Sequence, residues 1–174
     1  ELQTKLLEEI VAATHNASVT HGDFSAQISA NRTGVMRIGA LLGTLGVERW
    51  LQGLAELNDY GERMARTALE ALPDGSYHFR DVMDDDGQGN RDIPLCVSVT
   101  LQRGQVEVDF SGTASQVAGN INCPLPVTAA AVFYVFRCLM HARTPACAGS
   151  FRLIRLQAAP GCLVNATAPA AVAA

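Results

Sequence analysis

Three consecutive acids, Asp84, Asp85 and Asp86, form the densest charge in the sequence and precede Gly87. Three carboxylates in one loop can hold a divalent cation, because hard cations prefer oxygen ligands. The run lacks, however, the alternating Asp/Asn spacing and the terminal Glu of an EF-hand loop. Acids between two strands are more typical of a solvated turn, so the spacing favours a turn over a metal site.

A second polar group follows the run Val108–Asp109–Phe110 in a loop that contains two glycines. Glycines let backbone amides approach a ligand, while hydroxyl and amide side chains supply donors and acceptors. Such a loop suits a polar substrate, although its spacing alone favours an ordinary turn. The candidate substrate or interface residues in it are Asp109, Ser111, Thr113, Asn120 and Asn122.

Other chemical signatures are missing from the sequence. It contains no Walker A loop, no GxGxxG fingerprint, no HExxH helix and no GxSxG elbow. The four histidines lie far apart, and the five cysteines form no CxxC pair, so no metal site is predicted from this chain. The odd number of cysteines favours reduced thiols and hence a cytoplasmic protein.

The elements that carry the first part of the chain are expected to be helices. Apolar residues recur every three or four positions over residues 2–17, 24–45 and 50–68. Thr20 and Asp23 are spaced as a capping box for the second helix, and Gly46 suits its C-terminal end. The run from Pro73 to Gly75 then predicts a turn.

Beyond that turn the period changes to two, which is typical of strands. Tyr77 and Phe79 alternate with polar residues, and the stretches 93–101 and 106–110 predict a β-hairpin around Arg103 and Gly104. Its apolar face carries Ile93, Leu95, Val97, Val99 and Leu101, and the opposite face Cys96, Ser98 and Thr100. The hairpin should bring the acidic run and the polar loop together at its open end.

The remaining elements complete an α+β prediction. Pro126 is expected to open a helix that runs to about His141, and residues 151–157 and 162–165 are expected to be strands. The predicted class is α+β, with N-terminal helices followed by an antiparallel hairpin-containing sheet and one apolar covering helix. We expect a helical segment over residues 1–72 and an α+β segment over residues 73–174.

Composition restricts the partners. A net charge of −4 with scattered basic residues argues against nucleic acid. The longest apolar stretch, residues 123–136, contains two prolines and is too short to span a membrane. Only 17% of the residues are charged, which indicates surface intended for other parts of an assembly. Because the sequence opens without Met and ends in small residues, we expect a chain truncated at both ends, internal to a larger subunit.

Four stretches together resemble the hydantoinase B/oxoprolinase family, the B-type subunit of ATP-dependent N-methylhydantoinases and 5-oxoprolinases. They occur in the family's order and cover nearly the whole chain. They are GDFSAQISANRTG (22–34), LPDGSYHFRDVMDDDG (72–87), VDFSGTASQVAGNIN (108–122) and VNATAPAAV (164–172).

The resemblance implies a hydrolase of C–N bonds in cyclic amides, acting on a hydantoin or 5-oxoproline. It also implies a hetero-oligomer in which an A-type partner binds ATP and Mg²⁺, with a divalent metal in an N-terminal region that this sequence lacks. The fragment alone is expected to be inactive, and no catalytic residue is assigned. Two alternatives stay open: a subunit of an ATP-dependent ketone carboxylase of the acetone or acetophenone type, and an interface segment without catalytic residues.

Overall fold

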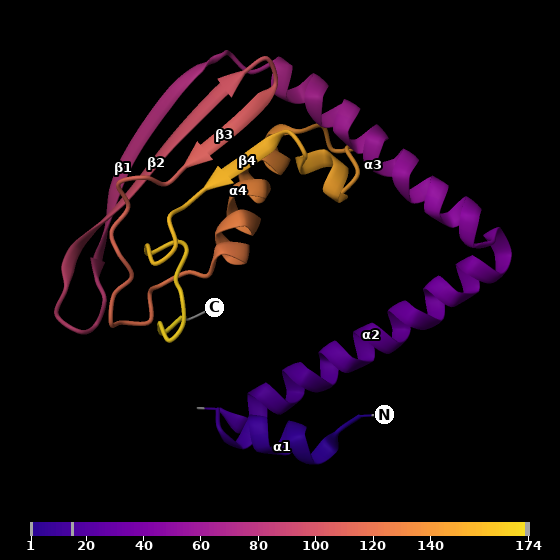
Figure 1. Cartoon of the computed structure of the whole chain (residues 1–174), viewed down its shortest axis with the longest axis horizontal. Coiled ribbons are helices and arrows are strands. Elements are labelled where there is room, and N and C mark those ends of the chain that lie inside the picture. Colours follow the sequence, from indigo (N-terminus) through magenta and orange to yellow (C-terminus); the bar gives the residue numbers. More distant parts are fainter. Residues whose placement is uncertain (1, 15, 173–174) are drawn as a thin grey trace. The chain divides into compact units, whose positions relative to one another are not determined.

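The computed structural model describes residues 2–14 and 16–172 (Figure 1). The chain divides into two compact units, one ending at Leu54 and the other starting at Ala55. The predicted boundary at residues 72 and 73 coincides instead with the change from helix to strand. The division into a helical and an α+β segment stays a prediction.

The first unit consists of helices. It contains α1 (Thr4–Ala12), α2 (Ala17–Leu45) and the start of α3 (Val47–Glu70). The Val19 amide donates to Asn16 Oδ1 at 3.4 Å, so Asn16 caps α2. The capping box predicted at Thr20 and Asp23 is therefore wrong, because Asn16 starts the helix earlier and places both residues inside it.

The end of α2 follows the prediction. Gly46 has φ of 77°, a left-handed value that favours glycine, and its amide donates to Leu42 O at 2.9 Å. None of the described side chains of α2 is buried, and Val35 and Met36 are 73% and 68% exposed. Phe24, Ile28 and Leu42 are half-buried, so the apolar residues of this helix are at most partly covered.

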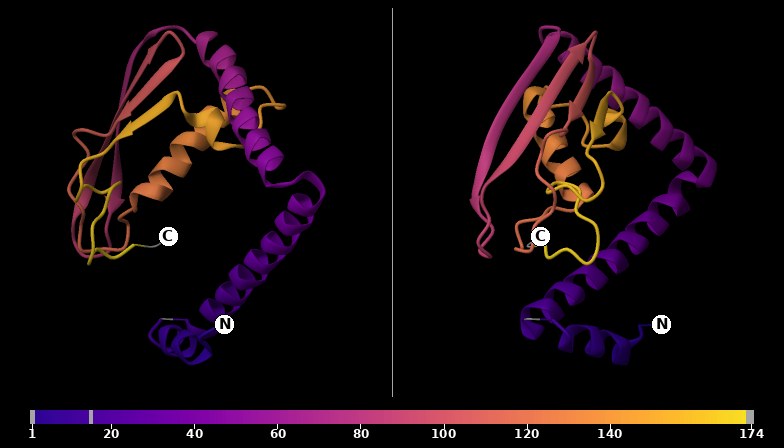
Figure 2. Two further views of the ribbon diagram at one scale, coloured as in Figure 1. Left: turned by 45° about the vertical axis from the view of Figure 1, so that its right-hand side comes forward. Right: turned by 60° about the vertical axis from the view of Figure 1, so that its left-hand side comes forward.

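The second unit is built on a four-stranded sheet with the order β1-β2-β3-β4 (Figures 1 and 2). Its strands are β1 (Gly75–Asp85), β2 (Arg91–Gln102), β3 (Gln105–Asp109) and β4 (Ile154–Gln157). The first three pair antiparallel, as predicted, but β4 pairs parallel to β3. The sheet is mixed because the chain returns through α4 (Leu125–Leu139), the kind of crossover that parallel strands need.

Two strand predictions near the C-terminal end are wrong in detail. Residues 148–151 form the 3₁₀ helix η1 (Ala148–Phe151), so the predicted strand 151–157 shortens to β4. Residues 162–165 form isolated bridges, in which Cys162 faces Ser115 and Asn165, and no strand. The turn between β2 and β3 is confirmed: Arg103 and Gly104 have φ of 50° and 71°, as a tight hairpin turn requires.

The core of the second unit lies between α4 and one face of the sheet. Val132 and Phe136 of α4 pack with Leu101, Val106 and Val108 of the sheet. Ala65 and Leu69 of α3 belong to the same buried cluster. The predicted alternation of β2 and β3 is thereby confirmed. Pro126 lies in the first turn of α4, where a missing amide proton costs no helical hydrogen bond. Within the described ranges, no helix is both long and apolar enough to cross a membrane.

The C-terminal half of α3 is fixed to the segment around η1. The Gly149 amide donates to Asn58 Oδ1 at 2.7 Å, and a Cβ at Gly149 would overlap the Asn58 carbonyl oxygen. Arg152 forms ion pairs with Asp59 at 2.8 Å and Glu62 at 3.2 Å. Glycine at this contact thus lets two backbones approach each other closely.

Candidate functional site

The tip of the β1–β2 hairpin meets the polar loop through Asp86. This carboxylate is 3% exposed and accepts the amides of Gln88, Asn90 and Gly119 at 2.9, 3.0 and 3.4 Å. The Asn90 side-chain amide also donates to it, at 2.6 Å. The hydrogen bond from the Asn90 side chain, with a smaller contribution from the backbone hydrogen bonds, lowers the pKa of Asp86. Burial acts in the opposite direction but does not outweigh these bonds. Asp86 therefore connects the hairpin tip to the loop as a carboxylate.

The other two acids of the run differ from Asp86. Asp84 and Asp85 are exposed at the end of β1, and Asp85 Oδ1 accepts the Gly87 amide at 2.8 Å. Over residues 2–14 and 16–172, no three or more His, Cys, Asp and Glu side chains are placed to hold a metal ion. The run is thus split into one buried structural carboxylate and two solvent-facing ones.

Asn122 fixes the polar loop next to the contact between Asp86 and Gly119. It is 3% exposed, and its Oδ1 accepts the Val117 amide at 2.8 Å. Its Nδ2 donates to the carbonyl oxygens of Val117, Gly119 and Ala171 at 2.8, 2.9 and 2.8 Å. A Cβ at Gly119 would overlap the Asp86 carbonyl oxygen. Asp86, Gly119 and Asn122 together form what we call the tip clasp.

Thr113 continues the sheet where β3 has ended. Its hydroxyl accepts the Cys96 amide at 3.0 Å and donates to the Cys96 carbonyl at 2.9 Å. One residue later, the Ala114 amide donates to Pro94 O at 2.9 Å. The side chain thereby satisfies backbone groups of β2 that no strand reaches. Asn120, in contrast, is exposed.

Asp109 and Ser111 lie at a second place, the end of β3. Asp109 Oδ1 accepts the Ser111 amide at 2.9 Å and its hydroxyl at 2.8 Å. Both residues line a cleft of about 370 Å³ together with Gln157 and with Leu125 at the start of α4. We call it the β3-end cleft. It combines a carboxylate, a hydroxyl and an amide beside an apolar wall.

The expected meeting of the two polar groups is therefore confirmed only in part. Asp86 contacts Gly119, but Asp109 pairs with Ser98, in the middle of β2, whereas Asp85 pairs with Arg91 at its start. At about 3.3 Å per residue, these positions on β2 are ~23 Å apart. The expectation of one shared mouth fails because β3 has 5 residues and β2 has 12.

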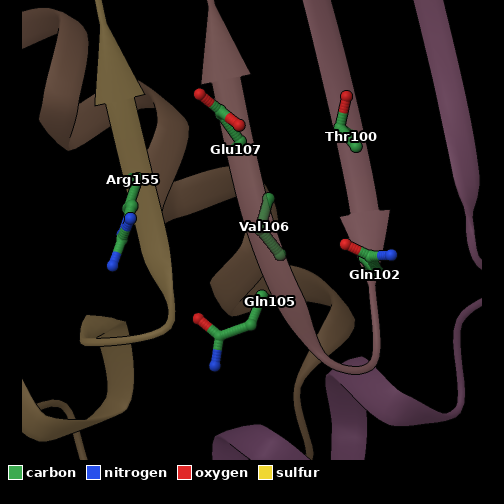
Figure 3. A pocket seen from close by; sticks show the side chains of 6 residues that line it. All are labelled: Thr100, Gln102, Gln105, Val106, Glu107 and Arg155. Atoms are coloured by element: carbon green, nitrogen blue, oxygen red, sulfur yellow. The ribbon is translucent and has the colours of Figure 1, made fainter.

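The polar face of the sheet carries side chains that sequence reasoning did not single out. His78 Nδ1 lies 2.8 Å from Ser98 Oγ across β1 and β2. Further along, Glu107 and Arg155 line a shallow pocket of about 390 Å³ with Thr100 (Figure 3). The alternation of Ser98 and Thr100 predicted that this face of β2 is polar. The residues of β4 that lie on the same face could not be predicted, because the parallel pairing of β4 with β3 was not foreseen.

Solved structures share this fold, and two of them overlap with most or all of the chain. The crystal structure of an ATP-dependent caprolactamase from Pseudomonas jessenii superimposes with a TM-score of 0.85 at 23% identity, covering 100% of this chain and 30% of that one. A nucleotide-free acetone carboxylase structure matches with a TM-score of 0.65 at 13% identity, covering 78% of this chain and 20% of that one. At these identities the likeness defines the fold class.

The chain belongs to the hydantoinase B/oxoprolinase family, whose model matches residues 1–174. It is 32% identical over 160 residues to the B-type subunit of a D-/L-hydantoinase from Pseudomonas sp. (strain NS671), covering 86% of this chain and 27% of that protein. It is 27% identical over 154 residues to 5-oxoprolinase of Saccharomyces cerevisiae, covering 86% of this chain and 12% of that protein. The chain thus spans less than a third of these relatives' length.

Proposed function

We propose that these residues are an internal portion of the B-type subunit of an ATP-dependent hydantoinase or 5-oxoprolinase. The whole protein would hydrolyse the C–N bond of a cyclic amide. The observation that carries the proposal is the family match over residues 1–174, supported by the similarity to the B-type subunit of a hydantoinase. In this proposal an A-type partner binds ATP and Mg²⁺, and the hetero-oligomer is cytoplasmic.

We place the substrate-contacting groups of this chain in the β3-end cleft. Ser111 donates its hydroxyl proton to Asp109, so the Ser111 oxygen keeps lone pairs that can accept the N–H of a cyclic amide. Gln157 donates its amide to Glu107, which leaves the Gln157 carbonyl oxygen as a second acceptor beside the cleft. The Asp109 carboxylate, held by Ser111, is suited to take a proton from an attacking water.

Asp109→Asn tests this placement in the complete complex. The side chain keeps its shape but loses its basicity, so ATP-dependent ring opening should fall by about 10²–10⁴-fold, the usual contribution of a general base. The matched control is Asp81→Asn, because Asp81 is an exposed acid of β1 that accepts, within the described part of the chain, only the amide of its neighbour Val82. The control should leave turnover unchanged.

The assembly state of the Asp109→Asn complex shows whether Asp109 contacts the substrate or only supports the subunit interface. Size-exclusion chromatography should show Asp109→Asn in the same complex as the wild-type protein. Loss of the A-type partner together with turnover would instead assign the cleft to the subunit interface. Full turnover in an intact complex would remove Asp109 from the mechanism.

A further inference from the structure

Another cleft of the second unit shares no residue with the β3-end cleft. It lies between the C-terminal half of α3 and the turn that follows α4, and its volume is about 440 Å³. That volume is within the range of small-molecule sites. Its lining residues are Tyr60, Met64, Thr67, Ala68, His141 and Arg143. None of these is acidic, so we name it the basic cleft.

One arginine, Arg143, lines the basic cleft, and two more contact its lining residues. Arg143 is exposed and has no ion-pair partner among the described residues. Arg63 lies over the Tyr60 ring, 5.9 Å from its centre. Arg137 donates to the carbonyl oxygens of His141 and Ala142 at 3.1 and 3.4 Å and thereby holds the turn that carries Arg143. The nearby Glu62 carboxylate is already paired with Arg66 and Arg152.

The hydrogen bonds of the turn also define which groups can donate. The Arg143 amide donates to His141 Nδ1 at 3.1 Å, which places the ring proton on Nε2 and makes Nε2–H a donor. Thr67 donates its hydroxyl to Arg63 O at 3.1 Å, so its oxygen is left as an acceptor. Arg143, His141 and the Tyr60 hydroxyl are therefore the donors available to a ligand.

The remaining lining is apolar. Met64, Ala68 and the ring of Tyr60 offer a surface for carbon atoms beside the three donors. A free phosphate ion would leave that surface unused, whereas a planar carboxylate suits the fork of an arginine and can carry an apolar body.

We propose that the basic cleft binds a small molecule that carries a carboxylate on an apolar body. Arg143 pairs with the carboxylate, His141 and Tyr60 donate to it, and the apolar body lies against Met64 and Ala68. The site is independent of the proposed ring-opening function, because it shares no residue with the β3-end cleft.

Titration of the full-length protein with benzoate, benzamide and inorganic phosphate, followed by NMR after selective isotope labelling, tests the proposal. Benzoate and benzamide have the same ring and differ in charge. Benzoate should bind with a dissociation constant in the millimolar range and shift the resonances of residues 60–68 and 141–143. Benzamide and phosphate should bind at least about tenfold more weakly, since each lacks one half of the recognition.

Arg143→Gln should weaken benzoate binding by about tenfold or more, because it removes a charge-assisted pair. Arg155→Gln is the matched control, since Arg155 is another arginine without an ion-pair partner among the described residues, on the polar face of the sheet. Tyr60→Phe is a second variant that keeps the ring and should weaken binding severalfold. Equal binding of benzoate and benzamide, no benzoate binding, or unchanged binding by Arg143→Gln would each overturn the proposal.

Discussion

Replacing Asn122 by alanine should destabilise the second unit strongly. The side chain is 3% exposed and satisfies four backbone groups: the amide and carbonyl of Val117, the carbonyl of Gly119 in the same loop, and the carbonyl of Ala171 from a separate segment. In Asn122→Ala, the Val117 amide and the three carbonyl oxygens lose their partner. Because the site is buried, water cannot replace that partner without opening the loop.

The magnitude follows from those four bonds. Each contributes about 0.5–1.5 kcal/mol net, and a shared donor counts for less, so Asn122→Ala should lower the free energy of unfolding by about 3 kcal/mol. With a urea dependence of about 1.5 kcal/mol/M, the midpoint should fall by about 2 M. Asn120→Ala is the matched control because Asn120 is exposed in the same loop, and it should shift the midpoint by less than about 0.3 M.

The spectroscopic signal has to report the second unit alone. All three tyrosines, at positions 60, 77 and 134, belong to it, whereas the single tryptophan, Trp50, belongs to the first unit. Urea unfolding should therefore be followed by near-ultraviolet circular dichroism of the tyrosines, with a reductant present for the five free cysteines. Equal midpoints for Asn122→Ala and Asn120→Ala would refute the role given to the tip clasp.

Four further substitutions test the same structure. Thr144→Val should raise the free energy of unfolding by about 1 kcal/mol, because the buried Thr144 hydroxyl has no partner among the described residues. Thr128→Val should lower the free energy of unfolding by about 1 kcal/mol, because it loses the 2.7 Å hydrogen bond to Val164 O. Urea unfolding of both variants measures the two changes. The Asp86 carboxylate stabilises the fold at pH values above the ordinary aspartate pKa of 3.8, and this stabilisation should be lost as the pH falls through the lowered pKa of the folded state. In Asp86→Asn, urea midpoints measured from pH 7 to 2.5 should therefore fall less at acid pH than those of the wild-type protein. Gly149→Ala should cost about 2 kcal/mol or more in thermal unfolding, because its Cβ would overlap the Asn58 carbonyl.

The sequence predicts those parts of the fold that depend on neighbouring residues. The apolar alternation of Ile93 and Leu101, followed by Val106 and Val108, is enough to predict the hairpin and its buried face. Its turn was predictable because Arg103–Gly104 is a short polar break between two such runs. Periods of two and of three to four residues are local properties of the chain.

The parts that were missed depend on contacts between distant segments. The parallel pairing of β4 with β3 brings Ile154 beside Val106, across 48 residues of chain that no local pattern relates. The start of α2 was misplaced because Asn16 and Thr20 are both good capping residues, and local composition does not choose between them.

The candidate site shows the same division. The polar residues of the loop were found by type, but their roles depend on burial. Asp86 and Asn122 are each 3% exposed and serve the fold, because their partners Gly119 and Ala171 are brought to them by tertiary structure. Asp109 and Ser111 stay accessible because β3 ends early and leaves a cleft beside α4.

Product analysis of the complete complex tests the central claim most directly. The full-length protein and the proposed A-type partner would be incubated with ATP and either 5-oxoproline or a hydantoin, and in parallel with ATP, acetone and bicarbonate. Our account predicts that mass spectrometry detects the ring-opened acid, only when ATP is present, and no incorporation of labelled bicarbonate. Carboxylation of acetone without any ring opening would contradict it and assign the chain to a ketone carboxylase.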